Sequence, residues 1–75
     1  MPRAPRITGR QAVRALQRLG WQVVRQRGSH VLLEHPDRPR PVTVPVHTGE
    51  TQKPKTLASL LEQAGLEADA FRRGL

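Results

Sequence analysis

The sequence predicts an α+β domain with the element order αβββα, in which two helices cover one face of a three-stranded antiparallel sheet. Three observations lead to this prediction. Apolar residues recur at helical spacing in two segments, three short β-branched runs lie between those segments, and the loops between the runs are short. Because short loops join antiparallel neighbours, we expect a meander whose second face is open to solvent or ligand.

The first helix is expected over residues 9–19. Thr8 and Gln11 form a capping-box pattern at its start, and Gly20 suits the position just past its end. The apolar positions at helical spacing are Ala12, Val13, Leu16 and Leu19. Residues 1–7 mix proline with arginine without any period, so we expect an irregular basic arm there.

Three strands are expected next, at residues 21–26 ("WQVVRQ"), 30–35 ("HVLLEH") and 41–46 ("PVTVPV"). The residues "RG" at 27–28 are expected to join the first two strands in a tight hairpin, in which Gly28 takes the positive φ. Proline cannot donate to a sheet ladder, so Pro45 predicts that the third strand lies at an edge or ends there.

The second helix is expected over residues 56–64, ending at Gly65. Its apolar positions are Leu57, Leu60, Leu61 and Ala64. Residues 67–75 form a short C-terminal tail, for which we expect one further helical turn and Phe71 folded onto the core. Trp21 and the strand valines are expected to pack with the helix leucines.

The whole chain, residues 1–75, has the length of a single small domain. A core of this size rarely supplies more than about 3–5 kcal/mol, so a protein partner is expected. The absence of cysteine excludes disulfides and thiolate metal sites. No apolar run approaches a signal peptide or a membrane span. We therefore expect a cytoplasmic protein without membrane association, monomeric when free.

The formal net charge is +7, and arginine far outnumbers lysine. A guanidinium offers a bidentate fork to phosphate, so nucleic acid is the first ligand class to consider. Two alternatives remain open, since net charge alone specifies a partner weakly. The basic residues can simply form a solvated surface, or reflect a GC-rich genome that favours arginine codons.

Several kinds of catalytic site do not fit the sequence. The six acidic residues form no obvious metal-binding pair, whereas a two-metal nuclease needs clustered carboxylates. The spacing of His30, His35 and His47 matches no common zinc pattern, and His35, directly before Pro36, is expected to be a turn residue. The serines lack a nearby base and orienting group. We therefore expect no metal and no cofactor.

Histidine in a basic setting remains as a source of chemistry. RNA carries its own nucleophile, the ribose 2′-OH, so a protein need supply only a base, an acid and positive charge. Imidazoles in general titrate near pH 6.5, at about neutral pH, and can serve in either proton transfer. His30 is the candidate catalytic residue because Arg25 and Arg27 precede it in "RQRGSH". His47 is a candidate second group if the second and third strands pair.

The candidate RNA-binding residues are Arg25, Arg27, Ser29, Lys53 and Lys55. The two lysines flank the entrance of the second helix, where free backbone N–H groups also favour a phosphate. Structural roles stay open for the same residues. His30 can be a half-buried strand residue, His47 can merely end its strand, and the arginines can be solvated hairpin charge.

Three segments, "LQRLGWQVVRQRGSHVLLEHP", "VTVPVHTGE" and "KTLASLLEQAGL", resemble the HicA-type (YcfA-like) toxin family, small mRNA interferases paired with HicB-type antitoxins. The resemblance extends from residue 8 to residue 66. It implies a double-stranded-RNA-binding-like fold, ribosome-independent cleavage of mRNA, arrest of translation, and neutralisation by a HicB-type antitoxin that covers the active site. On this pattern the catalytic histidine corresponds to His30.

This chain departs from the family pattern at Lys55, where relatives often carry glycine. The prediction is a metal-independent endoribonuclease whose His30 moves a proton at the scissile ribose phosphate. Its alternative is a non-catalytic RNA-binding module of the same fold, in which His30 is structural. A third reading is a basic interaction domain for an acidic protein.

Overall fold

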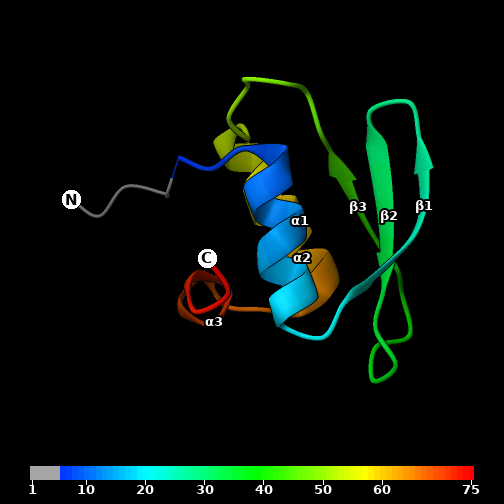
Figure 1. Cartoon of the computed structure of the whole chain (residues 1–75). Helices are drawn as coiled ribbons and strands as arrows, with labels where there is room; N and C mark the ends of the chain where they lie inside the picture. The colour runs from blue at the N-terminus through cyan, green and yellow to red at the C-terminus, as the bar shows by residue number, and fades with distance from the viewer. Residues whose placement is uncertain (1–5) are drawn as a thin grey trace.

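The computed structural model describes residues 6–75, so the predicted arm lies largely outside the described residues. The elements in chain order are α1 (Gly9–Arg18), β1 (Gln22–Arg27), β2 (His30–Glu34), β3 (Val42–Pro45), α2 (Pro54–Ala64) and α3 (Ala68–Arg72). The sheet has the antiparallel order β1-β2-β3, and both long helices lie on one side of it (Figure 1). The predicted α+β fold is therefore confirmed. None of the described helices is long and apolar enough to cross a membrane.

Local signals at both ends of α1 act as predicted. The Thr8 hydroxyl accepts a hydrogen bond from the Gln11 backbone N–H at 3.1 Å, and the Gln11 side chain accepts one from the Thr8 N–H at 2.8 Å. At the other end Gly20 has a φ of 99°, and the Trp21 N–H donates to the Leu16 carbonyl at 2.9 Å. This C-terminal motif turns the chain sharply into β1.

The turn between β1 and β2 fixes which side chains share a sheet face. Arg27 pairs with His30, so Gly28 and Ser29 form a two-residue turn in which Gly28 has a φ of 58°. Such turns match the natural twist of the strands that they join. Register then follows along the hairpin, because a slip of one residue would move every side chain to the other face.

The end of β3 at Pro45 was predicted correctly, whereas the start of α2 at Pro54 was not. β3 lies at a sheet edge and ends at Pro45, as expected. However, α2 begins at Pro54, two residues before the predicted start at residue 56. Proline is favoured in the first turn of a helix, because its missing N–H would have no intrahelical partner there.

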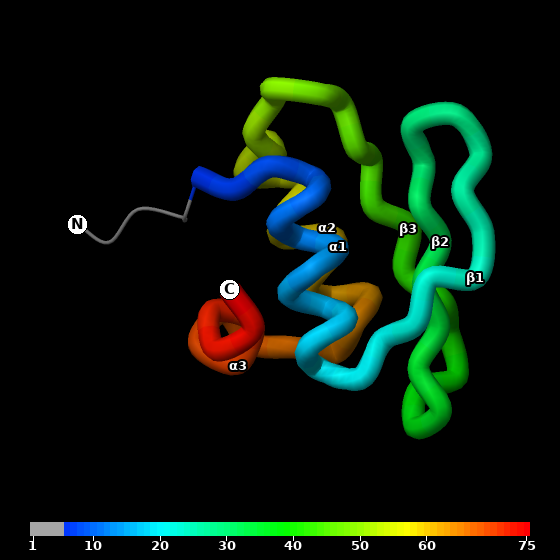
Figure 2. The backbone as a smooth tube through the Cα atoms, in the orientation of Figure 1, coloured from blue at the N-terminus to red at the C-terminus, as the bar shows by residue number. Residues whose placement is uncertain are grey.

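The core lies between the helices and the inner sheet face. Trp21 is 3% exposed and Phe71, in the tail helix α3, is 1% exposed, as predicted. Ile7, at the end of the predicted arm, is also buried, at 4%. Its carbonyl accepts a hydrogen bond from the Gln52 N–H at 2.6 Å, and Figure 2 shows this segment beside the β3–α2 loop.

The prediction that the strand valines are buried is wrong for β1. Val23 and Val24 are 42% and 49% exposed, and every residue of β1 is exposed. The buried strand residues belong to β2 and β3, and they are Val31, Leu33, Val42 and Val44. The helix layer therefore covers the β2 and β3 side of the sheet and leaves β1 uncovered.

Candidate functional site

His30 is the first residue of β2 and is exposed on the open face of the sheet. Side chains alternate along a strand, and the next residue, Val31, is buried against the helices. His30 pairs with Arg27 on one side and with Pro45 on the other. Paired residues in an antiparallel sheet project their side chains to the same face, so these three neighbour one another there.

Arg25 joins this group because its partner, Leu32, lies two residues from His30 on β2 and therefore on the same face. It pairs with Leu32, while Val23 pairs with Leu33, so the register shifts between Val23 and Arg25. Arg25 and Arg27 are two residues apart with regular pairing between them, so both lie on the open face, and the shift places Val23 on the inner face. Within residues 6–75 the ion pair that forms joins Arg72 to Asp69, so neither arginine is neutralised by a carboxylate of the described chain.

Ser29 contributes to the site through its backbone. Its carbonyl accepts a hydrogen bond from the Val46 N–H at 2.6 Å, and its side chain is half-buried. This bond continues the β2–β3 pairing by one step and holds the hairpin turn against the segment that follows β3. His47, the next residue after Val46, therefore lies near the hairpin turn, which directly precedes His30.

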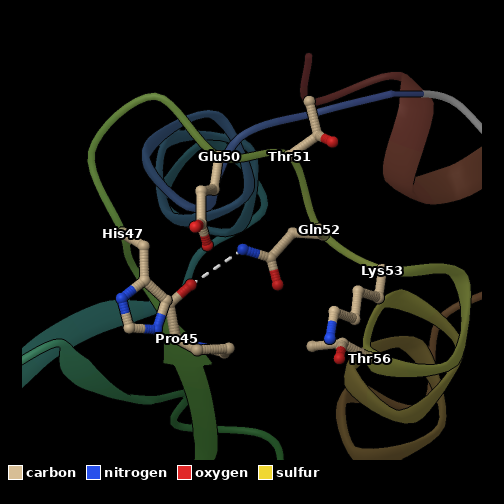
Figure 3. Close-up of a pocket in the computed structure, with 7 residues that line it drawn as sticks. All are labelled: Pro45, His47, Glu50, Thr51, Gln52, Lys53 and Thr56. Atoms are coloured by element: carbon tan, nitrogen blue, oxygen red, sulfur yellow. Dashed lines mark hydrogen bonds between the residues drawn. The ribbon is translucent and has the colours of Figure 1, made fainter.

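A pocket of about 230 Å³ lies beside the open face, between the end of β3 and the first turn of α2. Its lining residues are Pro45, His47, Glu50, Thr51, Gln52, Lys53 and Thr56. Figure 3 shows His47 and Lys53 on opposite sides of it, with Gln52 between them. His47, which follows β3, and Lys53, which precedes α2, were both predicted as site residues, and they line one concave surface.

Gln52 shapes this pocket, and the sequence analysis missed it. Its side-chain Nε2 donates to the Pro45 carbonyl at 2.7 Å, while its backbone N–H donates to Ile7. Its Oε1 is buried without a hydrogen-bond partner among the described residues. A glutamine in a polar loop carries no periodic signal, so only the tertiary structure reveals that it connects β3, the loop and the start of α1.

Gly9 permits the close approach on which this arrangement depends. A Cβ at this position would lie 2.5 Å from the Pro45 carbonyl oxygen and 2.7 Å from the Val46 Cα. Real Cβ atoms do not approach backbone so closely, so any other residue would push α1 away from the end of β3. The first residue of α1 is thus fitted to the strand end that lines the pocket.

Pro45 connects the two groups of predicted residues. It pairs with His30 on the sheet and lines the pocket with His47 and Lys53. Lys55 lies in the first turn of α2, exposed and outside the pocket. Lys53 is the N-cap residue and makes no side-chain cap, so the first backbone N–H groups of α2 remain free to bind an anion.

His35 belongs to a different part of the molecule. Its Nδ1 accepts a hydrogen bond from the Asp37 N–H at 3.0 Å, and its ring lies 5.3 Å from that of Trp21. It follows the last residue of β2, at the opposite end of that strand from His30, and has the turn role expected. Across residues 6–75 no group of three His, Asp or Glu side chains could hold a metal ion.

Comparison with known proteins agrees with the resemblance in the sequence motifs. A family model described as "HicA toxin of bacterial toxin-antitoxin" matches residues 9–66. The matched range begins with α1 and ends just after α2, so it contains the open sheet face, the pocket and every candidate site residue. A search of the curated proteins found no match.

Proposed function

The chain belongs to the HicA toxin family of bacterial toxin-antitoxin systems, and from that membership we propose that it is a metal-independent endoribonuclease that cleaves mRNA. Cleavage in the cytoplasm would arrest translation and growth. We further propose that a HicB-type antitoxin covers the active site and neutralises it.

One observation carries the proposal, namely that His30 is exposed at the end of β2 with Arg27 directly opposite on the same face. Arg25 follows along that face, and no carboxylate of the described chain forms an ion pair with either arginine. A guanidinium that holds the scissile phosphate brings the adjacent ribose within reach of the imidazole. Charge and a proton-transfer group therefore meet at one surface.

The proposed chemistry uses the RNA's own 2′-OH. One imidazole accepts the proton of this hydroxyl, whose oxygen attacks the adjacent phosphorus. The bond to the 5′-oxygen of the next nucleotide breaks, and that oxygen takes a proton from a second group. The products are a 2′,3′-cyclic phosphate and a 5′-OH. His30 carries out one of the two proton transfers, and His47 is the candidate for the other.

Substrate binding in this proposal extends from the sheet to α2. Lys53, on the far side of the pocket from His47, and Lys55 supply positive charge near the free N–H groups of the helix. Ser29 lies at the hairpin turn beside His30 and is a candidate for a further contact to the RNA backbone. An RNA strand that crosses Pro45 would contact both groups of residues at once.

The test is cleavage of labelled RNA in the presence of EDTA by the wild type and by His30→Ala. We expect the variant to be slower by about 10²–10⁴-fold, with RNA affinity little changed. Thr43→Ala is the matched control, because Thr43 is exposed on the same face but two residues further from the turn. Circular dichroism checks that each variant is folded.

If His30→Ala and the wild type cleave RNA at equal rates, His30 is not a catalytic residue. If neither protein cleaves but both bind RNA, the non-catalytic RNA-binding module becomes the better account. Expression in cells adds a second readout, since the wild type should arrest growth when produced alone and His30→Ala should not.

A further inference from the structure

A second surface lies between α1 and β1, on the helix side of the sheet. It is a groove of about 350 Å³. Its apolar floor and basic rim are made by Val13, Val23, Val31, Val46, Arg10 and Arg14. None of these residues takes part in the proposed cleavage of RNA, and the groove lies on the opposite sheet face from His30.

The floor of the groove is apolar surface that the packing of α1 on the sheet leaves partly exposed. Val23 pairs with Leu33, which is fully buried, and so projects to the same inner face. Yet Val23 remains 42% exposed, so the described chain covers it only in part. Exposed aliphatic surface in a concave site, rimmed by polar groups, is typical of a docking surface for another protein.

The rim indicates the charge of the partner. Arg10 and Arg14 are one helical turn apart on α1 and both are exposed, and no acidic residue among residues 6–75 lines the groove. A second copy of this chain, with its net charge of +7, would bring further positive charge. RNA would satisfy the arginines but offers no aliphatic complement to the valine floor. The surface therefore fits a protein segment that carries both aliphatic and acidic side chains.

We propose that the groove between α1 and β1 docks an acidic segment of the antitoxin, with aliphatic side chains on the valines and carboxylates at Arg10 and Arg14. The inference rests on family membership, which supplies an antitoxin partner, and not on the nuclease mechanism. Val31 and Val46 adjoin His30 and His47 in the chain, so the groove lies on the reverse side of the segments that carry these two histidines. Docking here would anchor the antitoxin on the inner face, while the rest of that protein covers the open face that carries His30.

The experiment measures the affinity of the purified cognate antitoxin for Val23→Asp and for Val24→Asp. Val24 is the matched control, because it is similarly exposed on the same strand but does not line the groove. We expect Val23→Asp to weaken binding by about 30-fold or more, as at an interface hot spot, and Val24→Asp to change it little. Both variants add the same negative charge to β1, so we expect them to bind RNA with similar affinity to each other.

The charge-reversed variant Arg14→Glu tests the rim independently and should also weaken antitoxin binding. Three outcomes would overturn the proposal. Val23→Asp and Val24→Asp could bind the antitoxin equally well, RNA affinity could fall with Val23→Asp but not with Val24→Asp, or the free wild type could be a dimer that Val23→Asp dissociates. Because affinity is the readout, the test stands even if the chain proves to have no nuclease activity.

Discussion

The two edge strands of the sheet flank the same central strand, yet they have opposite environments. In β3, Val42 and Val44 are completely buried, whereas all six residues of β1 are exposed. Both strands carry valines, so composition does not explain the contrast. The helices pack over β3 and leave β1 uncovered on both faces. One edge thus stabilises the fold, and the other is free to bind ligands.

The uncovered strand presents different chemistry on its two faces. Arg25 and Arg27 lie on the open face with His30, while Val23 lies on the inner face and forms part of the groove's floor. The bulge near Val23 is what allows this separation, since it shifts the register before Arg25. In the two proposals made above, RNA binds the open face of this strand and a segment of the antitoxin binds its inner face.

The largest difference expected between the edges is in stability. Val44→Ala removes two methyl carbons from a fully buried site and should lower the free energy of unfolding by about 2 kcal/mol, from lost burial and the resulting cavity. Urea denaturation followed by circular dichroism measures this loss. A change near zero would mean that β3 does not anchor the core as its burial indicates.

Much of the contrast lies beyond what local sequence patterns can predict. The capping box at Thr8 and the positive φ of Gly28 depend on a few neighbouring residues, and both were predicted correctly. The turn itself was predicted one residue too early, since it consists of Gly28 and Ser29 and Arg27 belongs to β1. The Pro54 start of α2 was missed, although proline at a first helical turn is itself a local signal. In contrast, the exposure of Val23 depends on where the helices pack, which alternation along a strand does not encode.

The candidate site divides in the same way. The His30 group could be found from the sequence because "RQRGSH" is contiguous and the hairpin register follows from its turn. The pocket could be found only in part, because Gln52 joins Ile7 and Pro45 through hydrogen bonds that span up to 45 residues of chain. Such long-range contacts leave no periodic trace.

An intermediate effect is expected for RNA binding. Arg27→Ala should weaken RNA affinity by several-fold and reduce the salt dependence of binding by about one phosphate contact. Thr43→Ala, on the same face of β3, should alter neither quantity. Fluorescence anisotropy with labelled RNA at several salt concentrations measures the affinity and its salt dependence for both variants. Equal effects of the two substitutions would show that RNA does not distinguish β1 from β3.

The smallest effect concerns the stability that β1 itself provides. Val23→Ala removes the same atoms as Val44→Ala, but from a side chain that is 42% exposed and borders an open groove. We therefore expect the free energy of unfolding to change by no more than about 0.5 kcal/mol in the free protein. In the complex the same substitution should cost more, because the antitoxin would cover this side chain. Urea denaturation of the free chain measures the change in the free energy of unfolding, and antitoxin affinity measures the cost in the complex.

A large loss of stability in the free chain would mean that Val23 already belongs to the core. The groove would then have no exposed apolar floor for a partner to cover.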